Sequence, residues 1–123
     1  MRRFLAKLTV VFALVLGACV SPTLPLPPPD APTQITLGSE AGTWTIRGSC
    51  TPGAVVLVKN DATGLIAGVV DIDRDGRYLV TIKAKPCDIG EVWEIIGDTA
   101  SSSTLFFVQP TANGSPTSTA CGP

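Results

Sequence analysis

The sequence contains no histidine among its 123 residues. This absence removes the Ser-His and Cys-His pairs that activate many nucleophiles, and it removes the usual ligands of a zinc site. The carboxylates are scattered along the chain, and scattered surface carboxylates on a small domain mainly keep it soluble. We therefore predict that the protein is not an enzyme.

Basic residues are also scarce in the chain after Cys19. Six Lys and Arg follow that cysteine against ten Asp and Glu, which leaves a formal charge of −4. Nucleic-acid-binding domains carry a basic patch, and anionic lipid surfaces attract polybasic segments. The sequence therefore predicts no nucleic-acid partner and no electrostatic binding to a membrane.

A hydrophobic run long enough to span a bilayer is missing as well. The run Leu8–Leu16 has nine residues, which as a helix would rise about 14 Å against a hydrocarbon core of about 30 Å. It follows the basic start MRRFLAK and precedes the small residues Gly17 and Ala18, which is the order of an export signal. We predict that residues 1–18 are a signal peptide.

Cysteine is rare, and the first of the four cysteines directly follows this signal. The motif Leu16-Gly17-Ala18-Cys19 resembles the bacterial lipobox. The resemblance implies that Cys19 is lipidated and that its acyl chains anchor the protein in a membrane of the bacterial envelope. Val20, in place of Asp, resembles the pattern sent to the outer rather than the inner membrane. The alternative is a plain secretory signal in which Cys19 forms a disulfide.

Proline is concentrated between the predicted anchor and the rest of the chain. Residues 19–33 contain six of the 11 prolines. Such a stretch favours an extended polyproline II conformation with a rise of about 3.1 Å per residue. We predict a spacer that holds the following domain about 40 Å from the lipid, in the periplasm or at the cell surface. A disordered tether is the alternative.

Helical periodicity is absent from residues 34–110. Strand-length runs of apolar and β-branched residues alternate there with Gly, Pro, Asn and Asp. These runs are ITL, TWTIRG, AVVLVK, LIAGVVDI, RYLVTIKA, EVWEII and STLFFV. They predict an all-β protein with a single small β-sandwich of about seven strands. Residues 111–123 are small and polar, and they are predicted to form a poorly ordered tail except around Cys121.

Three cysteines remain for this domain after lipidation of the first. A domain of about 75 residues has a thin core, and exported domains of that size often add a disulfide. Cys50 follows one predicted strand and Cys87 lies in a predicted turn, so we predict a disulfide between Cys50 and Cys87. A bond between Cys87 and Cys121 is the alternative. In either case one thiol is left, buried or available for an intermolecular bond.

The turns of the domain resemble those of bacterial Ig-like domains. Pro52-Gly53-Ala54 precedes a strand, Asp73–Tyr78 contains Asp-x-Asp-Gly followed by an aromatic residue, and Asp98–Ser103 is a small polar turn. The resemblance covers residues 35–108. It implies an Ig-like sandwich with a structural or protein-binding role, and it names no ligand. A carboxypeptidase-regulatory-like sandwich is the alternative fold.

The segment DIDRDG offers a candidate metal site. Asp71, Asp73, Asp75 and Gly76 have the spacing of the first half of an EF-hand loop, which binds calcium. The bidentate Glu of such a loop is missing, because Ile82 stands at its position. The competing interpretation is a β-hairpin with Asp-Gly at its turn. Calcium is thus the single candidate cofactor.

The burial or exposure of the two tryptophans distinguishes between two of the remaining functional hypotheses. Trp44 and Trp93 are predicted to fill the core between the sheets. We then expect a non-catalytic structural or protein-binding module whose partner is an envelope protein or the cell wall. An exposed tryptophan would instead favour a carbohydrate- or ligand-binding module. Calcium bound by the three aspartates would favour a calcium-responsive one.

Overall fold

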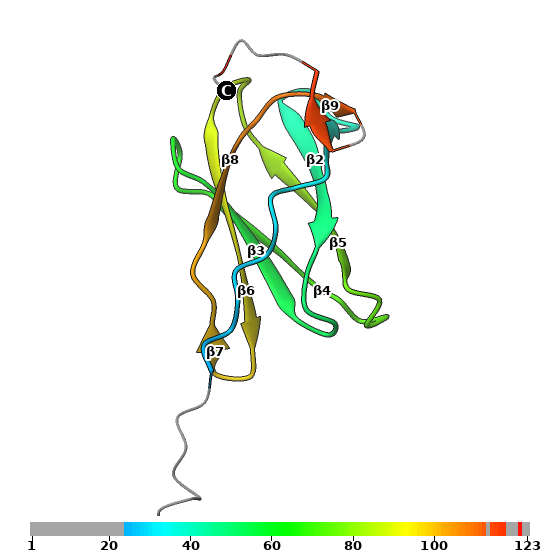
Figure 1. Ribbon diagram of the computed structural model, residues 1–123. Helices are drawn as coiled ribbons and strands as arrows, with labels where there is room; N and C mark the ends of the chain where they lie inside the picture. The colour runs from blue at the N-terminus through cyan, green and yellow to red at the C-terminus, as the bar shows by residue number, and fades with distance from the viewer. Residues whose placement is uncertain (1–23, 113, 118–120, 122–123) are drawn as a thin grey trace, which may run out of the picture.

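The computed structural model describes residues 24–112, 114–117 and 121, and this part of the chain is built from β-strands and loops without a helix. All seven predicted strands are confirmed, and three two-residue strands join them (Figure 1). The elements are β1 (Gln34–Leu37), β2 (Thr43–Ser49), β3 (Val55–Asn60), β4 (Ile66–Val70), β5 (Arg77–Lys83), β6 (Ile89–Ile96), β7 (Thr99–Ala100), β8 (Thr104–Phe107), β9 (Thr111–Ala112) and β10 (Ser115–Pro116).

The first sheet has three antiparallel strands in the order β1-β2-β5. Its register pairs Trp44 with Ile82 and Ile46 with Val80. Because directly opposed residues share a face of the sheet, these four side chains lie together on the buried face. The polar residues between them point to solvent, as the alternation in TWTIRG and RYLVTIKA predicted.

The second sheet has five antiparallel strands in the order β4-β3-β6, and both β7 and β8 pair with the far edge of β6. Val56 and Val58 from β3 and Val92 from β6 are fully buried on its inner face. Gly90 lies opposite Phe106, and the ring fills the space above the glycine. A side chain at Gly90 would therefore collide with Phe106.

One hydrophobic core lies between the two sheets. Burying a side chain of Val, Ile or Phe contributes roughly 1.5–3 kcal/mol, so this cluster is the main source of stability. Its members are Ile35, Trp44, Ile46, Val56, Val58, Tyr78, Val80, Ile82, Ala84, Val92, Phe106 and Val108. The predicted burial of Trp44 is confirmed.

Trp93 does not fill the core, contrary to the prediction. It lies opposite Leu57 on the outer face of the second sheet, and both side chains are only partly buried. Alternate residues of the strand EVWEII face opposite sides of the sheet. The side that is buried carries Val92 and the carboxylate of Glu94. Glu94 is buried because Thr51 donates two hydrogen bonds to it, from its N–H (2.8 Å) and from its hydroxyl (2.5 Å).

The segment DIDRDG does not form a β-hairpin. It connects β4 in the second sheet to β5 in the first, so the chain crosses from one sheet to the other there. The left-handed conformation expected at the turn is present, since Gly76 has a φ of 74°.

The predicted Cys50–Cys87 disulfide is wrong, because Cys87 bonds to Cys121 and Cys50 is free. Ser49, next to Cys50, pairs with Arg77 at the start of β5, whereas Cys87 follows the other end of that strand. Seven residues at about 3.3 Å each separate the two ends by roughly 20 Å. A disulfide requires Cα atoms about 4.4–6.8 Å apart.

Both ends of the predicted domain differ from their expected bounds. Pro29 and Pro32, assigned to the spacer, are buried against the domain, so the packed part begins within residues 19–33. The predicted tail contains the short hairpin of β9 and β10, which Cys121 ties back to Cys87.

The segment predicted to be a signal peptide and the predicted lipidation site, Cys19, lie outside the described residues. Within those residues, no helix is long and apolar enough to cross a membrane.

Candidate functional site

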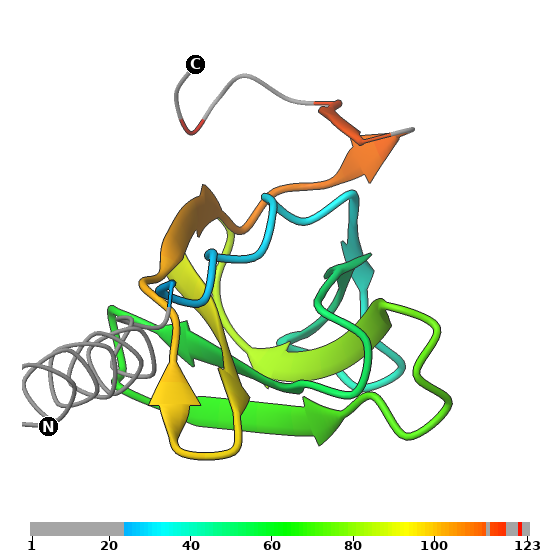
Figure 2. The same ribbon diagram turned by 60° about the horizontal axis from the view of Figure 1, so that its bottom comes forward.

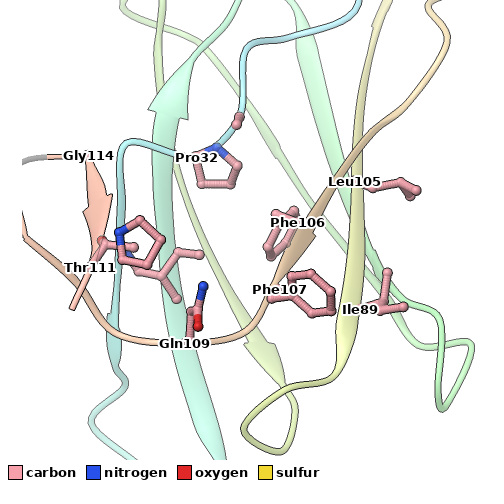
Figure 3. Close-up of a pocket in the computed structure, with 11 residues that line it drawn as sticks. Pro32, Ile89, Leu105, Phe106, Phe107, Gln109, Thr111 and Gly114 are labelled. Carbon is pink, nitrogen blue, oxygen red and sulfur yellow. The ribbon is translucent and has the colours of Figure 1, made fainter. Parts of the chain in front are cut away.

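A groove opens where the chain before β1 diverges from β8 (Figure 3). Its volume is about 380 Å³. Ile35 and Phe106 come from the core, Leu105 and Phe107 line one side, and the β9–β10 hairpin lines the other. The lining is mostly apolar, and it contains no charged side chain.

Two hydrogen bonds between distant parts of the chain hold this groove open. The hydroxyl of Thr104 donates to the carbonyl oxygen of Pro29, which fixes the proline-rich segment beside the start of β8. The N–H of Ile35 donates to Oγ1 of Thr111 (2.6 Å) and joins β1 to the hairpin. In Figures 1 and 2 residues 24–33 accordingly run between β8 and the first sheet.

Gln109 is the buried polar residue of the groove. Its side chain is 5% exposed, and within the described chain its Oε1 has no hydrogen-bond partner. Figure 3 places the carboxamide between Phe107 and Thr111. An unpaired buried carbonyl costs about 1–3 kcal/mol. A ligand that donates a hydrogen bond in the groove would remove this cost.

The backbone of β8 has a free edge at the same place. The N–H of Val108 donates to the carbonyl oxygen of Asp88 (2.8 Å). Antiparallel pairing alternates between bonded and non-bonded positions, so Phe106 also bonds to β6 while Leu105 and Phe107 do not. The N–H and C=O groups of Leu105 and Phe107 therefore point away from β6, toward the groove.

The three aspartates of the candidate calcium site do not all come together: the side chain of Asp75 interacts with that of Asp71, without Asp73. Oδ2 of Asp71 accepts hydrogen bonds from the N–H groups of Gly76 (2.9 Å) and Gly53 (3.1 Å), while Asp73 and Asp75 are exposed. In the described residues, no three groups of the types that ligate metals lie close enough to hold an ion. The structure thus uses Asp71 to tie the sheet-crossing loop to the turn before β3.

The hydrogen bonds to Asp71 also change the pKa of its carboxyl group. The N–H of Gly53, followed by that of Gly76, lowers the pKa of this carboxyl against the opposing effect of burial. A lowered pKa means that the carboxylate stabilises the fold above its unfolded-state pKa. That stabilisation is lost as the pH falls toward the folded-state pKa.

Cys50, the free thiol, is not a nucleophile at neutral pH. Burial raises its pKa to about 11, and the negative charges of Asp71, Glu94 and Asp75 add to the effect. The thiolate is the reactive form of cysteine, so this thiol reacts slowly over the physiological range. The raised pKa also means that Cys50 favours the folded state below pH 9 and ceases to do so as the pH rises to about 11.

Alkylation by iodoacetamide at pH 8 is expected to be about 100-fold slower for Cys50 in the folded protein than in the urea-unfolded protein, because the pKa rises from 9.0 to about 11. Mass spectrometry of timed samples measures both rates. The Asp71→Asn variant, which removes one charge beside the thiol, is the comparison and should react faster. Equal rates in the folded and unfolded protein would contradict the protection.

The sequence pointed to neither Gln109 nor the free edge of β8. Gln109 is simply the polar residue between the run LFFV and Pro110. Its burial depends on the hairpin of β9 and β10 and on the proline-rich segment, which meet β8 only in the folded protein.

The chain matches no protein-family model, no curated protein and no solved structure.

Proposed function

We propose that the protein is a lipid-anchored component of the bacterial cell envelope whose single Ig-like domain is a non-catalytic, protein-binding module. The groove beside β8 carries this proposal. It combines an apolar lining, an unpaired buried amide oxygen and free backbone groups, which are features that bind a ligand without transforming it.

The strand order supports the Ig-like part of the proposal. In the sheets β1-β2-β5 and β4-β3-β6-β8 the fourth strand pairs with the third, a feature of the variable type of Ig domain, whereas the constant type places its fourth strand in the other sheet. The N-terminal motif supports the lipid anchor at Cys19, with the outer membrane favoured over the inner by Val20. The proline-rich stretch would then hold the groove away from the lipid.

Carbohydrate binding is the second candidate, and Trp93 is the observation that favours it. Its side chain lies on the outer face of the second sheet rather than in the core. Lys59 and Glu91 lie opposite each other on the same face and could supply polar contacts to a sugar. Trp93 is partly buried, however, which leaves less of its ring free for stacking.

The Cys19→Ala variant tests the anchor and the binding role together. We expect the wild-type protein in the membrane fraction and the variant in the soluble fraction, because a protein without acyl chains loses its hydrophobic anchor. Cross-linking in living cells followed by mass spectrometry should capture one envelope protein with the wild type and much less of it with the variant.

A Cys50→Ala variant is the matched control, since it removes a cysteine without removing the anchor. A Cys19→Ala protein that stays in the membrane with unchanged mass would contradict lipidation. Capture of abundant bystander proteins alone would contradict a dedicated binding role.

A further inference from the structure

We propose that the groove and the edge of β8 together bind an extended peptide segment of the partner protein, which adds to the second sheet as a further strand. This inference rests on the proposed protein-binding function and specifies its ligand. The peptide carries apolar side chains at alternate positions and basic residues beside them.

The backbone of β8 supplies the pairing groups. Leu105 and Phe107 direct their N–H and C=O groups away from β6, and in the described chain no backbone group pairs with them. The neighbouring segment cannot complete the edge at Pro29 and Pro32, since proline has no N–H to donate. An added strand would satisfy these groups in the same way that peptides complete other open sheets.

The groove supplies the side-chain specificity. Alternate residues of a strand point to the same face, so one apolar side chain of an added strand would enter the space between Phe107, Ile35 and Pro116. A volume of about 380 Å³ is at the lower end of the range for ligand sites and fits one or two such side chains. The unpaired Oε1 of Gln109 is itself buried, so a donor group of the peptide would reach it after the carboxamide rotates toward the groove.

The charges beside the groove favour a basic peptide. Glu91 lies directly opposite Leu105, and Asp30 precedes Ala31 of the lining. The carboxylate of Asp88, which precedes Ile89, is already engaged, because its Oδ2 accepts hydrogen bonds from the Asn60 side chain and from the N–H of Lys85. Glu91 and Asp30 are thus the carboxylates beside the groove, while Lys59 lies opposite Glu91 and Lys85 lies beside Asp88. The chain after Cys19 also carries a formal charge of −4. Charge complementarity of this kind speeds association and selects partners.

The opposite edge of the second sheet provides an internal comparison. In β4, the register with β3 leaves the N–H of Ile66 pointing outward, and this residue is 57% exposed against 62% for Leu105. None of the residues of β4 lines the groove. Ile66→Pro and Leu105→Pro therefore each remove one outward-pointing N–H from an edge of the second sheet. The groove is present at the edge that contains Leu105 and not at the edge that contains Ile66.

The experiment selects peptides from a display library of random dodecapeptides on the full-length lipoprotein in detergent micelles. We expect enrichment of sequences with apolar residues at alternate positions and with flanking Lys or Arg. N-methylation of the backbone nitrogens along one edge of a selected peptide should abolish binding, and N-methylation along the other edge should not. That asymmetry is specific to strand addition.

Three variants locate the site on the protein. Leu105→Pro should weaken peptide binding roughly tenfold, as expected for the loss of a backbone hydrogen bond at the edge, and Ile66→Pro should not change it. Gln109→Leu should raise the melting temperature, because it removes the unpaired polar group, and should still weaken binding. A melting curve for each variant verifies that the fold is intact.

Absence of enrichment, equal effects of the two prolines, or insensitivity to N-methylation would each overturn the proposal. Self-association that Leu105→Pro abolishes would also overturn it, in favour of a second copy of this chain as the added strand. If cross-linking in cells still captures one envelope protein in these cases, the binding function stands and the strand-addition site is wrong.

Discussion

Replacing Cys87 and Cys121 together with serine is expected to lower the free energy of unfolding by about 4 kcal/mol. The disulfide closes a loop between residues 34 positions apart and so restricts the unfolded chain. Domains of this size have total stabilities of about 5–15 kcal/mol, so the loss would be a large share. Urea denaturation of the oxidised protein and of the double variant measures it.

Cys50→Ser is the control, because it removes the free thiol and leaves the disulfide in place. Its expected effect is within about 1 kcal/mol, since the side chain is only partly buried and its Sγ lies 4.0 Å from Asp71 Oδ2. Peptide mapping without reduction should recover Cys87 joined to Cys121. A Cys50-containing disulfide, or an equal loss of stability in Cys50→Ser, would contradict the pairing.

The Cys87–Cys121 disulfide also stabilises one side of the groove. Cys121 follows the β9–β10 hairpin, which lines one side of the groove through Thr111, Gly114 and Pro116. Without the disulfide the hairpin would still be joined to the rest of the domain by the hydrogen bond from the N–H of Ile35 to Oγ1 of Thr111. Loss of the disulfide should therefore weaken peptide binding as well as stability.

Gly90→Ala is expected to destabilise the protein by about 3 kcal/mol. A Cβ atom at this position would lie 2.7 and 2.8 Å from the two Cε atoms of the Phe106 ring. The ring is in the core between the two sheets, so it cannot move without disturbing its neighbours. Thermal or urea denaturation, monitored by circular dichroism, measures the change.

Two further variants separate this collision from a general effect of replacing glycine. At Gly68, also within a strand, the atom that a Cβ would approach too closely is Cδ2 of Leu57 (2.7 Å), and this flexible side chain can move aside, while the carbonyl oxygen of Val56 would lie at an ordinary contact distance of 3.4 Å. Gly68→Ala should therefore cost much less than Gly90→Ala. Combining Gly90→Ala with Phe106→Ala should cost less than the sum of the two single changes, because the ring that collides is gone. Strict additivity would show that the predicted collision does not occur.

Gly90 and Gln109, both near β8, have opposite effects on the stability of the fold. Gly90 leaves room for the tip of the Phe106 ring against the second sheet, which contributes to stability. Gln109 does the reverse, because its buried oxygen has no partner in the described chain and an apolar side chain of similar size would avoid that cost. A destabilising polar group at the rim of a groove is the pattern expected where function competes with stability.

The strand segments could be predicted because their evidence is local. In β2 and β5 the alternation of apolar and polar residues marks both the strand and its buried face, and the burial of Trp44, Tyr78 and Val80 confirms it. In β6 the same approach failed, because Glu94 shares the buried face with Val92. The hydroxyl and N–H of Thr51 offset the cost of burying this carboxylate by donating hydrogen bonds to it, and Thr51 is 43 residues away in the sequence.

By itself, the sequence determined which segments become strands, the absence of histidine chemistry and the resemblance of the N-terminus to a lipoprotein signal. The tertiary structure alone decided that Cys87 pairs with Cys121, that Trp93 faces outward and that a groove forms beside β8. These features depend on contacts between residues far apart in the chain, such as Thr104 with Pro29 and Ile35 with Thr111. Local residue preferences carry no information about such contacts, because they arise only when the two sheets have packed together.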